Sequence, residues 1–339
     1  MSDEQTGVPG MTGRESSTRD MARSPARNGV AGIDLSPAAH HRSSRRFRDF
    51  AWRGQLILLL LPFLLGIVSL VFLPALLGLP LAFTSYNSLS TPEFNGLQNF
   101  RDLWNDRIFH LSLRNTIGFI VVAVPLRLLG ALAIALLLVK GFRGVGPMRA
   151  AVVLPTVVPD IAWALAWLWI FNPIYGPLNI LLRAIGIEGP AWMLDENGAR
   201  FAIILMMSWQ LGEGFVICLG ALGDIPSEIV DHARVDGAGR WEQFRDITLP
   251  YIAPYLLVLV ARDTLFSLHA NFVPAKILGQ DGGPNYATTY LPMWIYTNAF
   301  GYLRLGYAAA MTWVTFLFTF AIVISTYLLM TRRFGGWKP

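Results

Sequence analysis

Long apolar runs separated by short polar segments form the dominant pattern of the chain. The runs lie at about residues 56 to 83, 113 to 139, 147 to 172, 201 to 223, 250 to 278 and 307 to 331. As helices that rise about 1.5 Å per residue, they are long enough to cross about 30 Å of hydrocarbon. The pattern predicts an all-α fold, a polytopic membrane bundle of about six transmembrane helices.

The composition agrees with a membrane protein, because 54% of the 339 residues are hydrophobic and only 14% are charged. Lysine and arginine gather before the first run, after the second, between the fourth and fifth, and after the sixth. The positive-inside rule therefore predicts that both termini and residues 224–250 lie in the cytoplasm. Topology accounts for the net charge of +5, so we expect membrane lipid and no nucleic acid as a partner.

Two regions differ from regular spans. Residues 1–54 are rich in Ser, Arg, Gly and Pro and predict a disordered cytoplasmic tail, which leaves residues 55–335 as the membrane domain. Prolines interrupt two of the runs, and we expect bent helices there. These are Pro62, Pro74 and Pro80 in the first run, and Pro155 and Pro159 in the third.

The polar insert of residues 224–250 predicts two short helical elements that meet at a bend. Ser227 predicts a helix start, and Glu228 and Asp231 are expected in the first turn, where carboxylates favour the positive helix end. Gly237 predicts the stop of this helix. In the second element three apolar residues share one face, and a proline opens the next span: Trp241, Phe244, Ile247 and Pro250.

This insert resembles the cytoplasmic coupling loop of membrane permease subunits in binding-protein-dependent ATP-binding-cassette (ABC) importers. In the sugar branch that loop usually reads Glu-Ala-Ala, three residues, then Gly, and here Asp231-His232-Ala233 and Gly237 fill those places. Asp231 carries a carboxylate one methylene shorter and His232 replaces a small residue, so the fit to the partner is expected to differ. The further matches are Asp236-Gly237-Ala238, Phe244, Ile247 and Leu249-Pro250.

The resemblance continues in order over about residues 55 to 335. The second and third runs are similar to the second and third spans of sugar permeases. The segment after the fifth run resembles the signature of the maltose/glycerol-3-phosphate first-permease type. The matching residues are Asn115-Thr116, Pro125-Leu126, Gly130, Leu154-Pro155, Trp167, Phe171, Gly282-Gly283-Pro284, Thr288, Tyr296, Phe300 and Gly306-Tyr307-Ala308.

The resemblance implies a permease domain at residues 55–335 that forms half of a translocation pathway in a bacterial or archaeal plasma membrane. The implied partners are a second homologous permease subunit, an ABC ATPase dimer, an extracytoplasmic solute-binding protein and a carbohydrate substrate. The sequence contains no Gly-rich phosphate cradle ending in Gly-Lys-Ser or Gly-Lys-Thr, and its single cysteine, Cys218, and scattered histidines form no metal-ligand pattern. We expect no catalytic residue, metal or cofactor in this chain, with ATP bound by the partner ATPase.

The resemblance also implies that the insert contacts the ATPase. Asp231 and Asp236 are expected to meet cations, and Val235, Trp241 and Phe244 are expected to make apolar contacts. For Asp236 and Gly237, the alternative is that they only shape the bend. The full set expected on this coupling surface is Asp231, His232, Ala233, Val235, Asp236, Gly237, Trp241 and Phe244.

Several charged side chains are expected near the middle of spans, where each is costly unless it is paired or wetted. They are Arg127, Asp160, Glu213, Arg262 and Asp263. One explanation is a set of interhelical ion pairs, Arg262 with Glu213 and Arg127 with Asp160. The other is a polar cavity that suits a ligand rich in hydroxyl groups.

For the cargo pathway we expect polar side chains on the two spans that flank the insert. In the family those spans line the substrate passage, and Asn271-Phe272 resembles its polar-aromatic pair. An aromatic ring there is able to stack on the apolar face of a sugar. The expected pathway residues are Gln210, Glu213, Thr264, Ser267, Asn271 and Phe272.

Other functions stay open. One alternative within the same branch is a permease for glycerol 3-phosphate or a polyol, with Arg127 or Arg262 as the partner of a phosphate. A polytopic membrane enzyme needs a nucleophile with a base or paired acids, and the sequence contains no such motif. An ion-coupled carrier is expected to show inverted repeats with interrupted helices, and the sequence shows no clear internal repeat.

Overall fold

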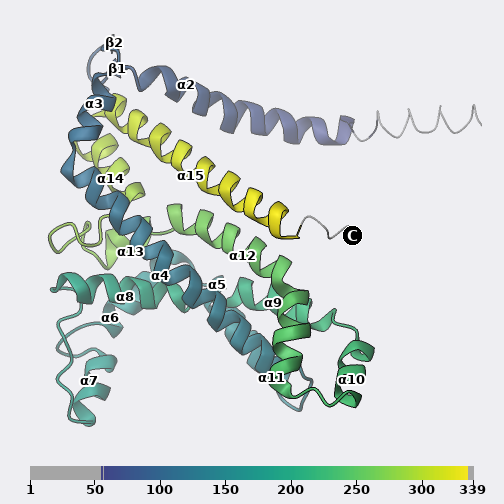
Figure 1. The fold of residues 1–339 in the computed structure, drawn as a ribbon. Coiled ribbons are helices and arrows are strands. Elements are labelled where there is room, and N and C mark those ends of the chain that lie inside the picture. Colours follow the sequence, from purple (N-terminus) through teal and green to yellow (C-terminus); the bar gives the residue numbers. More distant parts are fainter. Residues whose placement is uncertain (1–54, 56, 335–339) are drawn as a thin grey trace, which may run out of the picture. The chain divides into compact units, whose positions relative to one another are not determined.

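A computed structural model of the chain describes residue 55 and residues 57–334. Helices predominate in this part of the chain, whose one sheet is a short antiparallel pair, β1 (Thr84–Ser85) and β2 (Glu93–Phe94) (Figure 1). The boundary between two units of the chain falls between Gly66 and Ile67. The tail that we expect to be disordered, residues 1–54, lies outside the described residues.

Over the described residues, four helices are long and apolar enough to cross a membrane. They are Ile57–Leu81, α4 (Arg107–Leu138), Arg240–Ile277 and Leu305–Leu328, the last within α15 (Leu305–Phe334). Two bent pairs also qualify, α5 (Val145–Val157) with α6 (Asp160–Ile170) at 101°, and α8 (Glu196–Ser208) with α9 (Gly212–Gly223) at 45°. With each pair counted as one span the total is six, and the predicted all-α membrane fold is confirmed.

Proline bends the third span where the sequence predicts it. Val158 and Pro159 adopt extended ψ angles of 130° and 137° between the end of α5 and the start of α6. In the first span, Pro74 lies in the first turn of α2 (Leu73–Leu81), directly after a π-helical turn, η1 (Val68–Phe72). The break in the fourth span at residues 209–211 is not predicted, because no proline marks it.

Shorter helices connect the spans. Two of them, α3 (Gln98–Asn105) and α7 (Pro177–Ala184), lie in the loops after the first and third spans. The insert contains α10 (Ser227–Val235), α11 (Arg240–Gln243) and a π-helical turn, η2 (Phe244–Thr248), and it leads into α12 (Leu249–His269). The segment between α12 and α15 contains α13 (Phe272–Ile277), α14 (Leu291–Tyr296) and a further π-helical turn, η3 (Thr297–Gly301).

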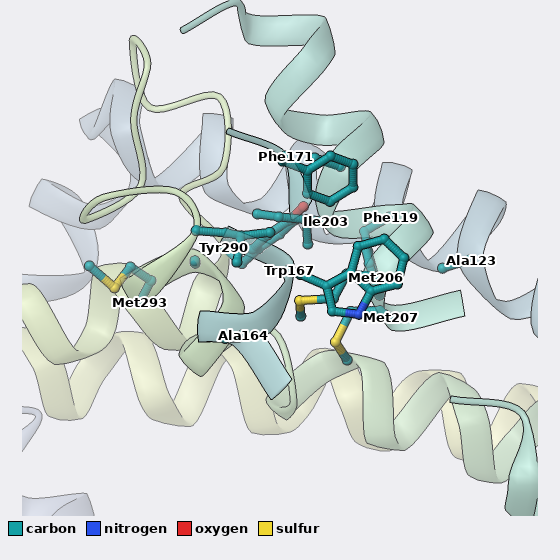
Figure 2. Close-up of a cluster of buried hydrophobic side chains, with 13 residues drawn as sticks. Phe119, Ala123, Ala164, Trp167, Phe171, Ile203, Met206, Met207, Tyr290 and Met293 are labelled. Carbon is teal, nitrogen blue, oxygen red and sulfur yellow. The ribbon is translucent and has the colours of Figure 1, made fainter. Parts of the chain in front are cut away.

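Helix α4 contributes to three buried clusters. In the cluster drawn in Figure 2, the ring of Phe119 lies 5.6 Å from that of Tyr290, among side chains of α6 and α8. Further along α4, Ala135 packs with residues of α9 and α12. At the other end of α4, Phe109 packs with residues of α14 and α15. This central position brings the polar residues of α4 within reach of both spans that flank the insert.

Asp106 caps α4 and joins it to two other helices. Its Oδ1 accepts the backbone N–H groups of Ile108 and Phe109, at 2.8 and 3.2 Å. Its Oδ2 accepts the Trp294 indole N–H at 2.9 Å and the Tyr307 hydroxyl at 2.7 Å. Partial burial raises the pKa of the Asp106 carboxyl, but these donors outweigh it, so that the pKa lies below its ordinary value of 3.8.

Asn115 of α4 holds the loop that precedes α14. Its side-chain amide donates to the carbonyl oxygens of Tyr286, at 2.9 Å, and Thr289, at 3.0 Å. The hydroxyl of Thr116 accepts the Leu291 N–H at 3.1 Å. The matching motif Asn115-Thr116 therefore satisfies backbone groups of the loop that follows another matching motif, Gly282-Gly283-Pro284.

Candidate functional site

The polar insert between α9 and α12 consists of a helix, a bend and a second helical arm (Figure 1). As predicted, α10 begins at Ser227 and has Glu228 in its first turn. Asp231 lies further along the helix than predicted, and its carboxylate pairs with the Arg234 guanidinium at 2.7 Å. This pair is exposed and contributes little stability, but it fixes the direction of the Asp231 side chain.

Gly237 ends α10, as the sequence predicts, in the left-handed conformation with φ at +85°. Its N–H donates to the Arg234 carbonyl at 3.1 Å, and the Ala238 N–H donates to the Ala233 carbonyl at 2.9 Å. These two bonds are the Schellman motif, which favours glycine because a Cβ strains the left-handed conformation. Gly237 therefore sets the direction in which the chain leaves α10.

The second arm is held to the bend and continues into the fifth span. The Glu242 carboxylate accepts the Gly239 N–H at 2.6 Å, at the start of α11. The rings of Trp241 and Phe244 lie 5.6 Å apart, which confirms that these residues share a face. Since α11, η2 and α12 follow one another directly, the arm and the span form one helical segment.

The expected coupling surface is mostly exposed. Val235 is 87% exposed and Trp241 67% exposed, and large exposed apolar side chains are typical of an interaction site. Ala233 and Phe244 are half-buried, and Phe244 lines a hollow of about 800 Å³ between the insert and the ends of α4 and α9. The other residues of this surface are exposed: Asp231, His232, Asp236 and Gly237. Their contact with an ATPase stays a prediction.

Ion pairs join three helices within the bundle. Arg262 of α12 pairs with Glu213 of α9, as predicted. Arg127 of α4 lies 3.6 Å from the Asp263 carboxylate and donates to the Ser267 hydroxyl, both on α12. The Arg127 side chain is only 4% exposed, and a buried charge inside a membrane bundle needs such partners.

The predicted pairing of Arg127 with Asp160 is wrong. Asp160 is the first residue of α6 and is exposed. The break at Pro159 turns the chain by 101°, so that Asp160 begins a helix instead of lying in the middle of a span. A carboxylate is favoured at that position by the positive helix end, and Asp263 takes its place beside Arg127.

Three of the predicted pathway residues lie next to Arg127 or Arg262. Glu213 pairs with Arg262, and Ser267 accepts a hydrogen bond from Arg127. Gln210 lies half-buried in the break between α8 and α9 and lines, with both arginines, a cavity of about 10 Å³. That volume has room for about one water molecule. The structure thus brings these residues together, next to the ion pairs.

Among the other predicted pathway residues, Thr264 is buried on α12 and Asn271 lies just beyond its end. Asn271 is fully buried, and its amide nitrogen and oxygen have no hydrogen-bond partner among the described residues. The ring of Phe272 lies 4.9 Å from that of Tyr296 and lines an apolar groove of about 630 Å³. A buried amide without partners costs stability. The burial of Asn271 therefore lowers the stability of the fold, and its packing offers the amide no compensating hydrogen bond within the described part of the chain.

Sequence reasoning missed two features. Asp106 joins three helices, and its only signal is an acidic residue a few positions before the apolar run at residues 113 to 139, where a helix cap is expected. An aromatic cluster also forms in the segment between α13 and α15, where Tyr286 and Tyr302 lie against Trp294. The signal for that cluster is a high density of tyrosine and tryptophan between the fifth and sixth apolar runs.

A known protein family matches the part of the chain that contains the insert and its flanking spans. The model of the family described as binding-protein-dependent transport system inner membrane component matches residues 128–334. The matched segment begins within α4 and ends with α15, and it includes the insert and both spans that flank it.

Several curated relatives cover most of the chain. It is 35% identical over 257 residues to the probable ABC transporter permease protein YesP of Bacillus subtilis, covering 75% of this chain and 82% of the relative. It is 32% identical over 293 residues to the sulfoquinovosyl glycerol transport system permease protein SmoG of Agrobacterium fabrum, covering 85% and 93%. It is 31% identical over 271 residues to the trehalose/maltose transport system permease protein MalF of Thermococcus litoralis, covering 79% and 89%.

A solved structure has the same fold. A bacterial ABC transporter involved in the import of the acidic polysaccharide alginate aligns with a TM-score of 0.74 and 22% identity, covering 86% of this chain and 99% of that chain. The resemblance expected from the sequence is confirmed by the family match and by the relatives. The chain therefore belongs to the inner membrane components of binding-protein-dependent transport systems, the permease subunits of ABC importers.

Proposed function

We propose that this chain is one permease subunit of a carbohydrate importer. It forms half of the pathway beside a second homologous permease, receives cargo from an extracytoplasmic binding protein, and is driven by an ATPase dimer that contacts the insert. The relative named for trehalose/maltose supports the class of cargo. The observation that carries the coupling role is the pair of exposed apolar residues, Val235 and Trp241, on either side of the hydrogen-bonded bend at Gly237.

The continuity of α12 supports a mechanical link between the insert and the pathway. The second arm of the insert runs into α12 at Leu249, and α12 ends at His269, just before Asn271. At about 1.5 Å per residue, its 21 residues extend over about 32 Å. A displacement of the insert is then carried to the pathway residues as a rigid-body movement, which is the kind of motion that alternating access requires.

Charge within the bundle favours a neutral cargo. Arg127 lies beside Asp263, and Arg262 pairs with Glu213. Both guanidinium groups already have carboxylate partners, whose negative charge offsets the positive charge that attracts a phosphate. This supports a carbohydrate or a polyol over glycerol 3-phosphate.

The orientation of the chain in the membrane and the subunit that binds ATP also belong to this function. The chain is a multi-pass protein of a bacterial or archaeal plasma membrane, with the insert and both termini in the cytoplasm, in accord with the positive-inside rule. Residues 55–335 form the permease domain. ATP binds to the partner ATPase, and this chain carries out no catalysis.

Reconstitution of the complete transporter in proteoliposomes tests the proposal. The solute is the carbohydrate bound by the binding protein encoded beside this chain. We expect uptake only when binding protein is outside and ATP and the ATPase are inside, with no uptake of glycerol 3-phosphate. Gradient-driven uptake by this chain alone identifies an ion-coupled carrier, and turnover of a solute without transport identifies an enzyme. Either result contradicts the proposal.

A further inference from the structure

A hollow of about 340 Å³ lies among α13, α14, η3 and the loop between α13 and α14. Helices α13 and α14 follow the end of α12 that is far from α10 and α11 (Figure 1). The proposed topology puts this end of the bundle on the extracytoplasmic side. The residues of the hollow that bear on its chemistry are Lys276, Asp281, Tyr286, Trp294, Tyr296 and Tyr302.

Aromatic rings form two open walls of this hollow. Tyr286 and Tyr302 stand edge-on to the Trp294 indole, with ring centroids 6.2 and 6.1 Å away and interplanar angles of 81° and 80°. Tyr286 is 44% exposed and Tyr302 is 55% exposed, whereas Trp294 is 6% exposed. The buried indole thus supports two tyrosines whose remaining surface is free to contact a ligand.

Charged groups supply the polar side of the hollow. The Lys276 ammonium pairs with the Asp281 carboxylate and lies 5.6 Å from the centroid of the Tyr296 ring. An ammonium donates hydrogen bonds and a carboxylate accepts them, so the pair suits hydroxyl groups in both roles while remaining neutral overall. Aromatic walls with a few convergent polar groups are typical of a small-molecule site. An apolar ring face with hydroxyl edges, the surface of a pyranose, matches this combination.

Hydrogen bonds hold the backbone and the indole that form the hollow. Asn115 bonds to the carbonyl oxygens of Tyr286 and Thr289, and the Thr288 hydroxyl donates to the Gly283 carbonyl at 2.7 Å. The Trp294 indole is held in turn by the Asp106 carboxylate. A site fixed in this way loses less conformational entropy when it binds a ligand.

Tyr296 connects the hollow to the predicted pathway. This residue lines both the hollow and the apolar groove that contains Phe272, and the two rings lie 4.9 Å apart. Phe272 is the neighbour of Asn271 in the chain. A solute that leaves the hollow along Tyr296 therefore meets the Phe272 ring next.

We propose that the hollow is an entry subsite that binds one neutral pyranose unit of the cargo before it reaches Phe272. Tyr286 and Tyr302 contact the apolar face of the sugar, and Lys276 and Asp281 bond to its hydroxyl groups. For the identity of the cargo, this subsite rests on the proposed function as a carbohydrate importer.

Saturation-transfer NMR with the full chain in lipid nanodiscs tests the subsite directly. The probes are methyl α-D-glucopyranoside, methyl α-D-galactopyranoside and maltose, with glycerol 3-phosphate as the charged comparison. We expect at least one neutral probe to bind, and its affinity to fall about five- to tenfold in Tyr286→Ala and in Tyr302→Ala, because each loses an aromatic contact. The matched control is Tyr175→Ala, since Tyr175 is 58% exposed and precedes α7 in another loop.

Two results overturn the subsite: no neutral probe binds, or both tyrosine variants bind as tightly as the wild type. Uptake measured against the concentration of binding protein adds a second test. If Tyr302→Ala raises the concentration for half-maximal uptake while probe binding is unchanged, the hollow contacts the binding protein and is not a sugar site. The NMR measurement needs no ATPase, so a lack of ATP-driven uptake by the wild type contradicts the proposed function separately.

Discussion

The Tyr307 hydroxyl donates a hydrogen bond of 2.7 Å to the Asp106 carboxylate, across 201 residues of sequence. The same carboxylate oxygen accepts the Trp294 indole N–H, so one acidic side chain joins the start of α4 to α14 and α15. Trp294 in turn supports the two tyrosines of the hollow. This junction is therefore expected to matter both for stability and for the shape of the proposed entry subsite.

Asp106→Ala removes the helix cap and both side-chain bonds. We expect the free energy of unfolding to fall by about 2 to 4 kcal/mol, because a cap contributes about 1 kcal/mol and a buried donor left unpaired costs about 1 to 3 kcal/mol. Denaturant unfolding in detergent, followed by tryptophan fluorescence, measures the loss. The matched control is Asp195→Ala, since Asp195 caps α8 through one exposed bond, to the Gly198 N–H at 2.8 Å. Equal losses in the two variants would contradict the junction.

The same carboxyl predicts a dependence of stability on pH. In the folded chain the pKa of Asp106 lies below its ordinary value of 3.8. Its contribution to stability is therefore complete well above that value and is lost as the pH falls through the folded pKa. We expect the difference in unfolding free energy between wild type and Asp106→Asn to stay constant from about pH 6 to 8 and to shrink below about pH 4. A difference that grows on acidification has the wrong sign.

Gly237→Leu tests the bend of the insert. A Cβ at Gly237 meets no atom within 4 Å, so the substitution strains only the left-handed backbone, by about 1 to 2 kcal/mol. We expect the membrane bundle to fold, ATP hydrolysis to continue and most uptake to be lost, because the second arm leaves α10 in a different direction. Gly237→Asn is expected to retain more uptake, since Asn tolerates this conformation. Gly239→Ala is the control, because φ at Gly239 is −68°. Normal uptake by Gly237→Leu argues against the coupling role.

Asp263→Asn tests the buried ion pair. The variant leaves the Arg127 guanidinium without its carboxylate, and we expect it to lower the free energy of unfolding by about 3 to 5 kcal/mol. Glu213→Gln is the comparison, because the Arg262 side chain is 39% exposed and the expected loss is about 1 kcal/mol or less. The double variant Arg127→Met with Asp263→Leu is expected to recover most of the stability, since no charge stays buried. Thermal unfolding in detergent distinguishes these cases, and similar losses in both single variants contradict this account.

Asn271→Leu is expected to separate stability from transport. Replacing a buried amide that has no partner removes a cost of about 1 to 3 kcal/mol, so we expect Tm to rise while uptake falls. Gln210→Ala is expected to weaken uptake with assembly of the complex unchanged. Ser208→Ala is the matched control, because the Ser208 hydroxyl is also buried without a partner, and it is expected to change uptake little. Unaltered uptake in both Asn271→Leu and Gln210→Ala removes these residues from the pathway.

The spans and the insert follow from local patterns. A run of apolar residues as long as the bilayer is thick needs no tertiary contact to predict a spanning helix. Gly237 is similarly local, because only the backbone of its own turn requires the left-handed conformation. These features hold for any packing of the bundle, which is why the sequence alone predicts them.

The partner of Arg127 and the aromatic hollow depend on packing. Whether Arg127 meets Asp160 or Asp263 depends on the rotation of α4 against α12 and on a break of 101° in the third span. Proline predicts that break but not its angle. The hollow likewise needs a loop whose backbone is held by Asn115, from 171 residues away. No local pattern contains that information.

Because α11, η2 and α12 form one continuous helical segment from the insert to the neighbourhood of Asn271, a displacement of the insert also displaces the far end of that segment. In this proposal the ATPase contacts the insert and not α12, so a change of ATPase leaves the pathway residues of α12 unaltered. A chimeric importer is accordingly expected to accept a foreign ATPase by exchange of residues 224–248, with α9 and α12 unchanged. The surface of the insert that contacts the ATPase is therefore free to vary between importers while the helix that transmits its movement stays the same.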